Sequence, residues 1–184
     1  MGNQQWNTDA RKGIIDAYVL NCLIRHRPLT RGLKMTAPFG FAFSKPGEGQ
    51  LVNALGRHVM RITGAATTNA VAIWETFVQP GEGAPLHVHE REEEIFYVMK
   101  GQFQFWCGDD TVLIDEGGTM ALPRGIPHRY QNMSSDEGHL LVAAVPGGFE
   151  RFFMEAEEQV PLSIEETVTL AAKFGVTLLP QENG

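Results

Sequence analysis

The chain has 184 residues, 43% of them hydrophobic, which is enough to bury the core of one domain. Its net charge of −7 argues against nonspecific nucleic-acid binding, because an acidic surface repels phosphate. The 2 cysteines, Cys22 and Cys107, form neither a metal motif nor a redox motif, and this usage is typical of a reducing compartment rather than of a disulfide framework.

The N-terminal segment, residues 1–34, differs in charge from the rest of the chain. It carries six Lys or Arg against two Asp, whereas residues 35–184 carry nine Lys or Arg against twenty Asp or Glu. Apolar residues recur at helical spacing from Ile14 to Leu23, which predicts a short amphipathic helix. We therefore predict an N-terminal arm over residues 1–34. The alternative is that the natural product begins at Met35, where the composition changes.

The longest apolar stretch of this segment, AYVLNCLI, is interrupted by Asn21 and is much shorter than a helix that spans a bilayer. We find no convincing secretory signal beside it. We therefore expect a cytoplasmic protein that associates with neither membranes nor nucleic acid.

Residues 35–184 are expected to form a single domain, and most of its predicted elements are strands. Between about residues 55 and 146, short runs rich in Val, Ile, Phe and Thr follow one another every eight to twelve residues. These runs are HVMRIT, AVAIWETFV, EIFYVM, QFQFWC, TVLI, TMALP and HLLVAAV. Turn signals made of Gly, Pro and Asp separate them. This spacing predicts an all-β sandwich or barrel rather than alternating βαβ units.

Two helices are predicted after the strands. FERFFMEAEE has an aromatic face, which we interpret as a packing surface. SIEETVTLAAKFG opens with a capping box, Ser163 with Glu166, and Gly175 fits its C-terminal end. We expect both helices to cover the β domain and to take no part in its chemistry.

The stretch APLHVHEREEEIFYVMKG, residues 84–101, contains the first candidates for a metal site. His87 and His89 are two residues apart, so on one strand both imidazoles point to the same face. Glu94 follows His89 at an odd spacing and would point away on a straight strand. A turn or bulge within the charged EREE stretch would reset the register, and a second strand would then start near Glu94.

A third histidine lies in the later stretch GGTMALPRGIPHRYQN, where His128 leads a short strand. If this strand lies beside the first histidine pair, the side chains of His87, His89, Glu94 and His128 converge inside the barrel. Three neutral imidazoles and one carboxylate suit one divalent transition metal ion, and the absence of a thiolate leaves Fe, Ni, Mn, Co, Cu and Zn all open.

The combined pattern resembles the cupins. Their first motif, G-x5-H-x-H-x4-E-x6-G, is present here as Gly81, His87, His89, Glu94 and Gly101. Their second motif, G-x5-P-x-G-x2-H-x3-N, is present as Gly117, Pro123, Gly125, His128 and Asn132. By motif the resemblance covers about residues 50–146, and PGGFERFF resembles the end of small bacterial quercetin 2,3-dioxygenase-like cupins. The resemblance implies a double-stranded β-helix, or jelly-roll barrel, that forms a homodimer and holds the metal inside its mouth.

The resemblance also implies a metal-dependent dioxygenase that acts on a small aromatic or enol-type substrate, such as a flavonol or diketone, together with dioxygen. Glu94 would take the acidic hydroxyl proton as catalytic base, with a pKa raised toward neutrality. Cupins with such a site also act as isomerases, decarboxylases and lyases, so a non-oxidative metal enzyme is one alternative. A cupin that binds a small molecule without catalysis is the other.

Apolar side chains beside the predicted ligands are candidates for a substrate pocket. Phe96 and Val98 share the inward face of the strand that starts at Glu94, and Tyr130 follows His128 in the same way. We predict that these three line the pocket, with simple filling of the barrel as the alternative.

Other ionisable residues receive structural interpretations. The glutamates next to the predicted ligand are expected to form a solvated turn, with a position behind the ligands as the alternative for Glu93: Glu90, Glu92 and Glu93. The remaining histidines are expected to be ordinary surface or loop residues: His26, His58 and His139. Three arginines are expected to be exposed, with anion binding as the alternative: Arg57, Arg61 and Arg124.

Overall fold

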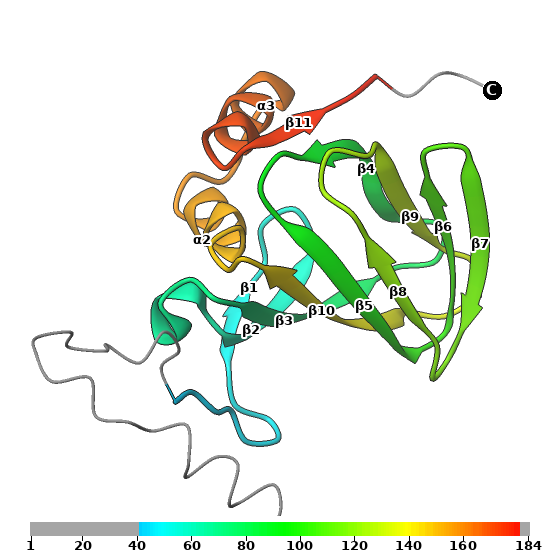
Figure 1. The fold of residues 1–184 in the computed structure, drawn as a ribbon, viewed down its shortest axis with the longest axis horizontal. Helices are drawn as coiled ribbons and strands as arrows, with labels where there is room; N and C mark the ends of the chain where they lie inside the picture. Colours follow the sequence, from blue (N-terminus) through cyan, green and yellow to red (C-terminus); the bar gives the residue numbers. More distant parts are fainter. Residues whose placement is uncertain (1–40, 181–184) are drawn as a thin grey trace, which may run out of the picture. The chain divides into compact units, whose positions relative to one another are not determined.

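The computed structural model describes residues 41–180. The predicted N-terminal arm, residues 1–34, and the alternative start at Met35 lie outside the described residues. Two antiparallel β-sheets pack face to face, and two short helices lie at one end of them (Figure 1). No helix between residues 41 and 180 is long and apolar enough to cross a membrane.

The first sheet has six strands. In spatial order these are β1 (Gln50–Val52), β2 (Arg57–Ile62), β3 (Ala72–Val78), β10 (Gly138–Val145), β5 (Glu93–Lys100) and β8 (Thr119–Leu122). A single 3-10 turn, η1 (Gly64–Thr67), connects β2 to β3. The order mixes strands that are distant in sequence, because β10 returns to lie between β3 and β5.

The second sheet has five strands. In spatial order these are β11 (Val176–Leu178), β4 (Gly83–His89), β9 (His128–Asn132), β6 (Gln102–Cys107) and β7 (Asp110–Asp115). All strand pairs in both sheets are antiparallel. The architecture is the predicted all-β double-stranded β-helix with covering helices at its C-terminal end.

The strands form because apolar residues alternate with polar ones at the two-residue period of extended chain. In β3 every second residue is buried, from Ala72 through Trp74 and Thr76 to Val78, and β10 shows the same alternation. The buried side chains meet between the two sheets, where Phe96, Phe103, Phe105, Leu122 and Leu140 are almost completely buried. All seven predicted runs are strands, whereas β1 and β11 were not predicted.

Both predicted helices are present, as α2 (Glu150–Glu157) and α3 (Ile164–Lys173). The predicted capping box is confirmed: the Ser163 hydroxyl accepts a hydrogen bond from the Glu166 N–H at 3.2 Å, and the Glu166 carboxylate accepts one from the Ser163 N–H at 2.8 Å. Gly175 follows the helix with φ +77°, a left-handed conformation that glycine adopts without strain. The chain then returns as β11, which pairs with β4.

The predicted register break between His89 and Glu94 is a crossing between sheets. β4 ends at His89 in one sheet, and β5 begins at Glu93 in the other. The inward faces of the two sheets face each other. Because the chain crosses from one sheet to the other, His87, His89 and Glu94 all point into the same interior. β9 lies beside β4, as predicted, and His128 is the register partner of His87.

Candidate metal centre

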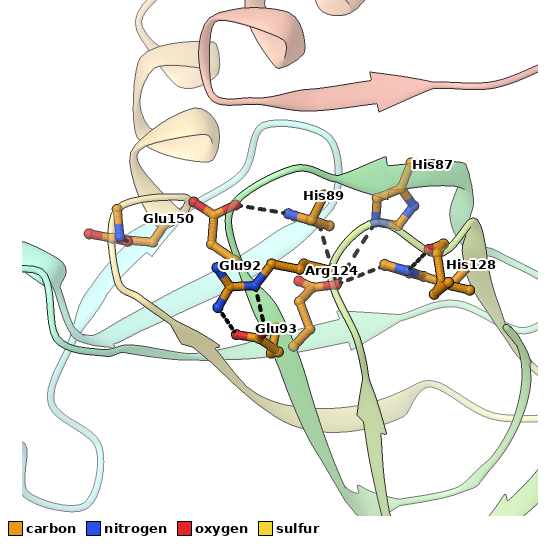
Figure 2. A network of polar contacts seen from close by, with 10 residues as sticks. His87, His89, Glu92, Glu93, Arg124, His128 and Glu150 are labelled. Atoms are coloured by element: carbon orange, nitrogen blue, oxygen red, sulfur yellow. Dashed lines mark hydrogen bonds and ion pairs between the residues drawn. The ribbon is translucent and has the colours of Figure 1, made fainter.

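Four predicted side chains converge in the interior of the barrel. The Nε2 atoms of three imidazoles lie close to Oε2 of Glu94, at 3.3 Å for His128, 3.5 Å for His89 and 3.9 Å for His87. All four residues are buried, and one potential ligand atom from each lies within 4.8 Å of the others. The three histidine rings point toward one another in Figure 2. The structure therefore brings together the four residues that the sequence placed on three strands.

The other ring nitrogen of each histidine has an acceptor of its own. Nδ1 of His87 lies 2.7 Å from the Pro85 carbonyl oxygen, and Nδ1 of His128 lies 2.9 Å from the Ile126 carbonyl oxygen. Nδ1 of His89 lies 3.4 Å from the Glu92 carboxylate (Figure 2). A carbonyl or carboxylate oxygen can only accept, so each neutral ring donates its proton from Nδ1 and leaves a lone pair on Nε2.

This arrangement directs acceptors at acceptors. When the three rings are neutral, their Nε2 lone pairs and a carboxylate oxygen face one another, and Nε2 of both His89 and His128 lacks a hydrogen-bond partner among the described residues. Buried polar atoms without partners cost free energy, on the order of 1–3 kcal/mol each. A cation removes this conflict, and histidines that donate Nδ1–H to carbonyl or carboxylate oxygens are typical metal ligands. The four residues form a buried group that could hold a metal ion.

The charges in this group shift its pKa values in opposite directions. Burial lowers the pKa of His87, and the Glu94 carboxylate offsets only part of that shift. Burial also acts to lower the pKa of His89, but the charges of Glu94 and Glu92 outweigh it and raise the pKa. Burial alone would raise the pKa of Glu94, yet the charge of a protonated His89 and hydrogen bonds from the His128 and His87 rings hold it well below its ordinary value in the metal-free protein. Glu94 is therefore ionised in the metal-free protein, where the expected rise of its pKa toward neutrality is not found.

Glu92 is the residue behind the ligands, a position that the sequence offered as an alternative for Glu93. The Glu92 side chain is buried and its carboxylate faces His89, so its prediction as a solvated residue is wrong. Glu93 instead forms an exposed ion pair with Arg124, which places two hydrogen bonds on its carboxylate (Figure 2). Glu90 is exposed, as expected. The spacing contained a usable signal, because Glu92 and Glu94 are two residues apart and extended chain turns such residues to one face.

The three arginines considered for anion binding form ion pairs with glutamates away from the candidate metal centre. Arg57 pairs with Glu137 at 2.7 Å, and Arg61 lies 3.5 Å from Glu75 and also donates to two backbone carbonyls. Neither they nor Arg124 line the cavity described next. The alternative of an arginine-bound anion in this cavity therefore has no support.

A cavity of about 190 Å³ opens beside His87 and Glu94. Of the predicted pocket residues, Phe96 and Tyr130 line it, but Val98 does not. Val98 follows Phe96 on the same face of β5 and is fully buried in the packed core, because only the part of β5 nearest Glu94 borders the cavity. Burial and the charge of Glu94 both raise the pKa of Tyr130, which keeps its phenol proton.

Most of the cavity wall comes from residues that the sequence did not indicate. Trp74 of β3 contributes, and so does the aromatic face of α2, through Phe149, Phe152 and Phe153. That face was interpreted as packing, and it does pack, with Phe149 and Phe153 each about 6 Å from Trp74 between ring centroids. The same rings also enclose the cavity, so α2 belongs to the candidate site.

His58 also lines the cavity, and its prediction as a surface or loop residue is wrong. It lies on β2, is 3% exposed, and its Nδ1 is 3.0 Å from the Thr76 hydroxyl. Burial lowers its pKa to about 4, against the weaker opposite influence of the Leu55 carbonyl. His139 lies on the half-buried outer side of β10, where Nε2 contacts Glu75 at 2.9 Å. His26 lies outside the described residues.

Comparison with known proteins agrees with this geometry. Residues 74–144 match the family described as Cupin domain. Over 72 residues the chain is 35% identical to quercetin 2,3-dioxygenase from Aspergillus japonicus, which covers 36% of this chain. The match spans only 20% of the length of that enzyme.

Two solved structures share the fold. KdgF from Halomonas sp. is 17% identical, covers 60% of this chain and 99% of its own, and has a TM-score of 0.52. An RmlC-like cupin from Shewanella frigidimarina is 15% identical, covers 62% of this chain and 98% of its own, and has a TM-score of 0.51. At these identities the likeness concerns the fold alone. Residues 74–144, which hold all four converging side chains, are therefore a cupin domain.

Proposed function

We propose that the protein is a metal-dependent dioxygenase that acts on a small aromatic or enol-type substrate, such as a flavonol or diketone. The observation that carries this proposal is the meeting of three Nε2 lone pairs and the Glu94 carboxylate at the wall of an aromatic cavity. A planar substrate suits walls made of aromatic side chains, and its oxygens suit a metal held at the polar end.

The four converging residues would hold one divalent transition metal ion: His87, His89, Glu94 and His128. When bound, this ion would supply Lewis acidity toward the substrate hydroxyl and reactivity toward dioxygen. Glu92 would keep His89 in the tautomer that directs Nε2 at the ion.

Other groups of the site would bind the substrate and accept the proton of its hydroxyl group. The Glu94 carboxylate borders the cavity, so it is placed to accept the proton of an acidic enol hydroxyl as the catalytic base. Tyr130, which retains its phenol proton, can donate a hydrogen bond to a substrate oxygen. Phe96, Trp74 and Phe149 would hold the planar body and exclude water.

The likeness to the Aspergillus enzyme supports oxidative chemistry over the alternatives. That relative is named a quercetin 2,3-dioxygenase, and its identity of 35% falls on a 72-residue segment. The match covers a fifth of that enzyme, so its activity is transferred here as a proposal only.

The test is oxygen consumption by protein purified without oxygen and loaded separately with Fe, Ni, Mn, Co, Cu or Zn. A panel of flavonols, diketones and catechols serves as substrates, and His128→Ala is the matched control. We expect uptake with at least one metal and one substrate, and none with the variant. Metal binding with no uptake by any combination would favour an isomerase, decarboxylase or lyase. Tight binding of a ligand that stays unchanged after long incubation would favour a non-catalytic binding protein.

We also propose that the protein is a homodimer. Ile95, Tyr97 and Met99 follow one another along the outward face of β5 and are 39–45% exposed, which leaves an apolar row on the sheet surface. A second copy of the chain would cover this row through a two-fold contact. Light scattering should give twice the chain mass for the wild type and a lower mass for Tyr97→Arg, and a monomeric wild type would contradict the proposal.

A further inference from the structure

A buried carboxylate at the start of α2 takes no part in the chemistry proposed above. Glu150, labelled in Figure 2, is 1% exposed. Its Oε1 accepts a hydrogen bond from the Gly64 N–H and its Oε2 accepts one from the Gly148 N–H, both at 2.7 Å. No lysine, arginine or histidine between residues 41 and 180 forms an ion pair with it. The carboxylate therefore joins two segments of backbone.

The two segments are η1 and the turn that leads from β10 into α2. The Gly147 N–H of the turn also donates to the Asn69 carbonyl at 2.9 Å, and the Asn69 N–H donates to the Gly64 carbonyl at 2.7 Å. A Cβ atom at Gly64 would lie 3.0 Å from the Gly148 nitrogen, which is closer than side chains normally pack. The two backbones are therefore in direct contact, and Glu150 forms a hydrogen bond with each of them.

Phe149 connects this junction to the candidate metal centre. It lies between Gly148 and Glu150 in the chain, and its ring lines the cavity. Its ring centroid is 4.5 Å from that of His89, and the two ring planes meet at 85°, which is an edge-to-face contact. Because the hydrogen bonds of Glu150 fix the backbone on both sides of Phe149, they also fix where its ring can lie.

Helix capping alone does not account for these contacts. An acidic residue in the first turn stabilises a helix through the helix dipole, and Glu150 is in the first turn of α2. Gly64, however, is 86 residues earlier in the chain and does not belong to α2. The hydrogen bond from Gly64 therefore fixes the start of α2 relative to η1, and adds nothing to the helix itself.

His89 depends more on packing than the other two histidines of the metal centre do. Its Nδ1 lies 3.4 Å from the Glu92 carboxylate, whereas Nδ1 of His87 and Nδ1 of His128 lie 2.7 Å and 2.9 Å from their acceptors. A distance of 3.4 Å is longer than that of an ordinary N–H···O hydrogen bond. The contact with Phe149 therefore has a larger share in holding the His89 ring.

We propose that Glu150 is a positioning residue for the metal centre: it holds the Phe149 ring against His89, so that Nε2 of His89 stays directed at the ion. This inference rests on the proposed function only in taking the four converging residues as metal ligands. Glu150 itself binds neither the ion nor the substrate and acts through Phe149.

The test is a double-mutant cycle in which zinc affinity is measured by competition with a chelator. Glu150→Gln keeps one acceptor and places an NH2 donor against the other backbone N–H. Zinc binding by the folded variant should weaken about two- to tenfold, which is the range of one aromatic contact. Phe149→Leu removes the contact with His89 and should cause a similar loss. In the double variant, Glu150→Gln should add no further loss, because the contact that it supports is already absent.

Glu155→Gln is the matched control. It removes another carboxylate of α2, whose partner Lys173 lies on α3, and should leave zinc affinity unchanged. Urea unfolding measures the free energy of unfolding separately, and a merely structural Glu150 would lower that free energy without changing the zinc affinity of the folded protein. If Glu150→Gln does not fold, Glu150→Asp keeps both acceptors on a side chain one methylene shorter, and zinc binding should weaken for the same reason.

The outcomes separate this inference from the proposed function. Unchanged zinc affinity in the folded Glu150 variant or in Phe149→Leu overturns the role of Glu150 and leaves the metal site intact. Losses that add in the double variant overturn it as well. A wild type that binds no zinc contradicts the metal site, because three imidazoles and a carboxylate suit this ion, and the role of Glu150 fails with it.

Discussion

The candidate metal centre and strand β2 both place a histidine beside the cavity, in opposite electrostatic surroundings. At the metal centre, each imidazole is beside a carboxylate, and its Nδ1 has an acceptor that directs Nε2 inward. On β2, His58 has a hydroxyl and aromatic rings around it, and burial outweighs the opposite influence of the Leu55 carbonyl on its pKa. The difference shows that the environment, rather than the residue type, makes a histidine a metal ligand or a neutral hydrogen-bonding group.

The largest effect is expected from His128→Ala, which removes one of the three converging imidazoles. Bound metal should fall from about one ion per chain to near zero, because the remaining groups no longer enclose a cation. Mass-spectrometric metal analysis after dialysis measures this. His139→Ala is the matched control and should bind metal as the wild type does. Unchanged stoichiometry in His128→Ala would mean that the four residues are not a metal site.

The next effect concerns the pH dependence of stability. Between pH 6.5 and about 4 the unfolded chain protonates His58, whereas the folded protein keeps it neutral. The stability that this group contributes is thus fully present above pH 6.5 and is lost as the pH falls toward 4, by up to about 3 kcal/mol. Urea unfolding of metal-free wild type and His58→Phe should show a smaller acid loss for the variant.

The difference between the two proteins isolates His58, because the other ionisable groups that line the cavity are present in both: Glu82, His87, Glu94 and Tyr130. Parallel pH profiles for the wild type and the variant would show that His58 is not the neutral buried group described here.

Glu92→Gln tests the link between the metal centre and the residue behind it. An amide oxygen accepts a hydrogen bond from His89 Nδ1–H less strongly than a carboxylate does, so metal affinity should fall by roughly 10- to 100-fold. Competition with a chelator measures the loss. Glu93→Gln changes the adjacent carboxylate, which pairs with Arg124 on the surface, and should leave affinity nearly unchanged. Equal losses in the two variants would contradict the distinct role of Glu92.

The smallest effect is expected at neutral pH. His58→Phe should change the free energy of unfolding of the ligand-free protein by less than about 1 kcal/mol, because the loss of the Nδ1 contact with Thr76 offsets the removal of a buried Nε2 that lacks a hydrogen-bond partner among the described residues, and the aromatic contact with Phe153 is kept. Denaturant titration is the measurement. A destabilised variant would indicate that the imidazole has a structural partner in the fold itself.

What could be predicted from the sequence depended on how local the determinants are. The strands were predictable because apolar and polar residues alternate along each run of consecutive residues, and this alternation buries Trp74 and Phe96. The converging residues were predictable because their types and spacings recur as two short motifs. Their meeting also needed a pairing between strands, which the sequence supported only through the cupin resemblance.

The features that were missed depend on contacts between distant segments. His58 becomes buried through Thr76 and through Phe153, which lies on a helix almost a hundred residues later. β11 has three residues and owes its conformation to hydrogen bonding with β4. Periodicity in such short or isolated stretches contains no information about their partners. Glu92 was missed for a different reason. Its two-residue spacing from Glu94 was visible in the sequence, but the neighbouring charged residues favoured a solvated turn.

β11 has one more consequence for the metal centre. Val176 and Leu178 are the register partners of His89 and His87. On either side of them, the Glu90 N–H donates a hydrogen bond to the Gly175 carbonyl, and the Leu179 N–H donates one to the Leu86 carbonyl. The strand β4, which contains two of the four candidate ligands, is thus held in place by its pairing with β11. Proteolysis between α3 and β11 would leave all four candidate ligands in the chain but would release the backbone pairing next to His87 and His89. Metal retention therefore measures whether β11 is still paired with β4.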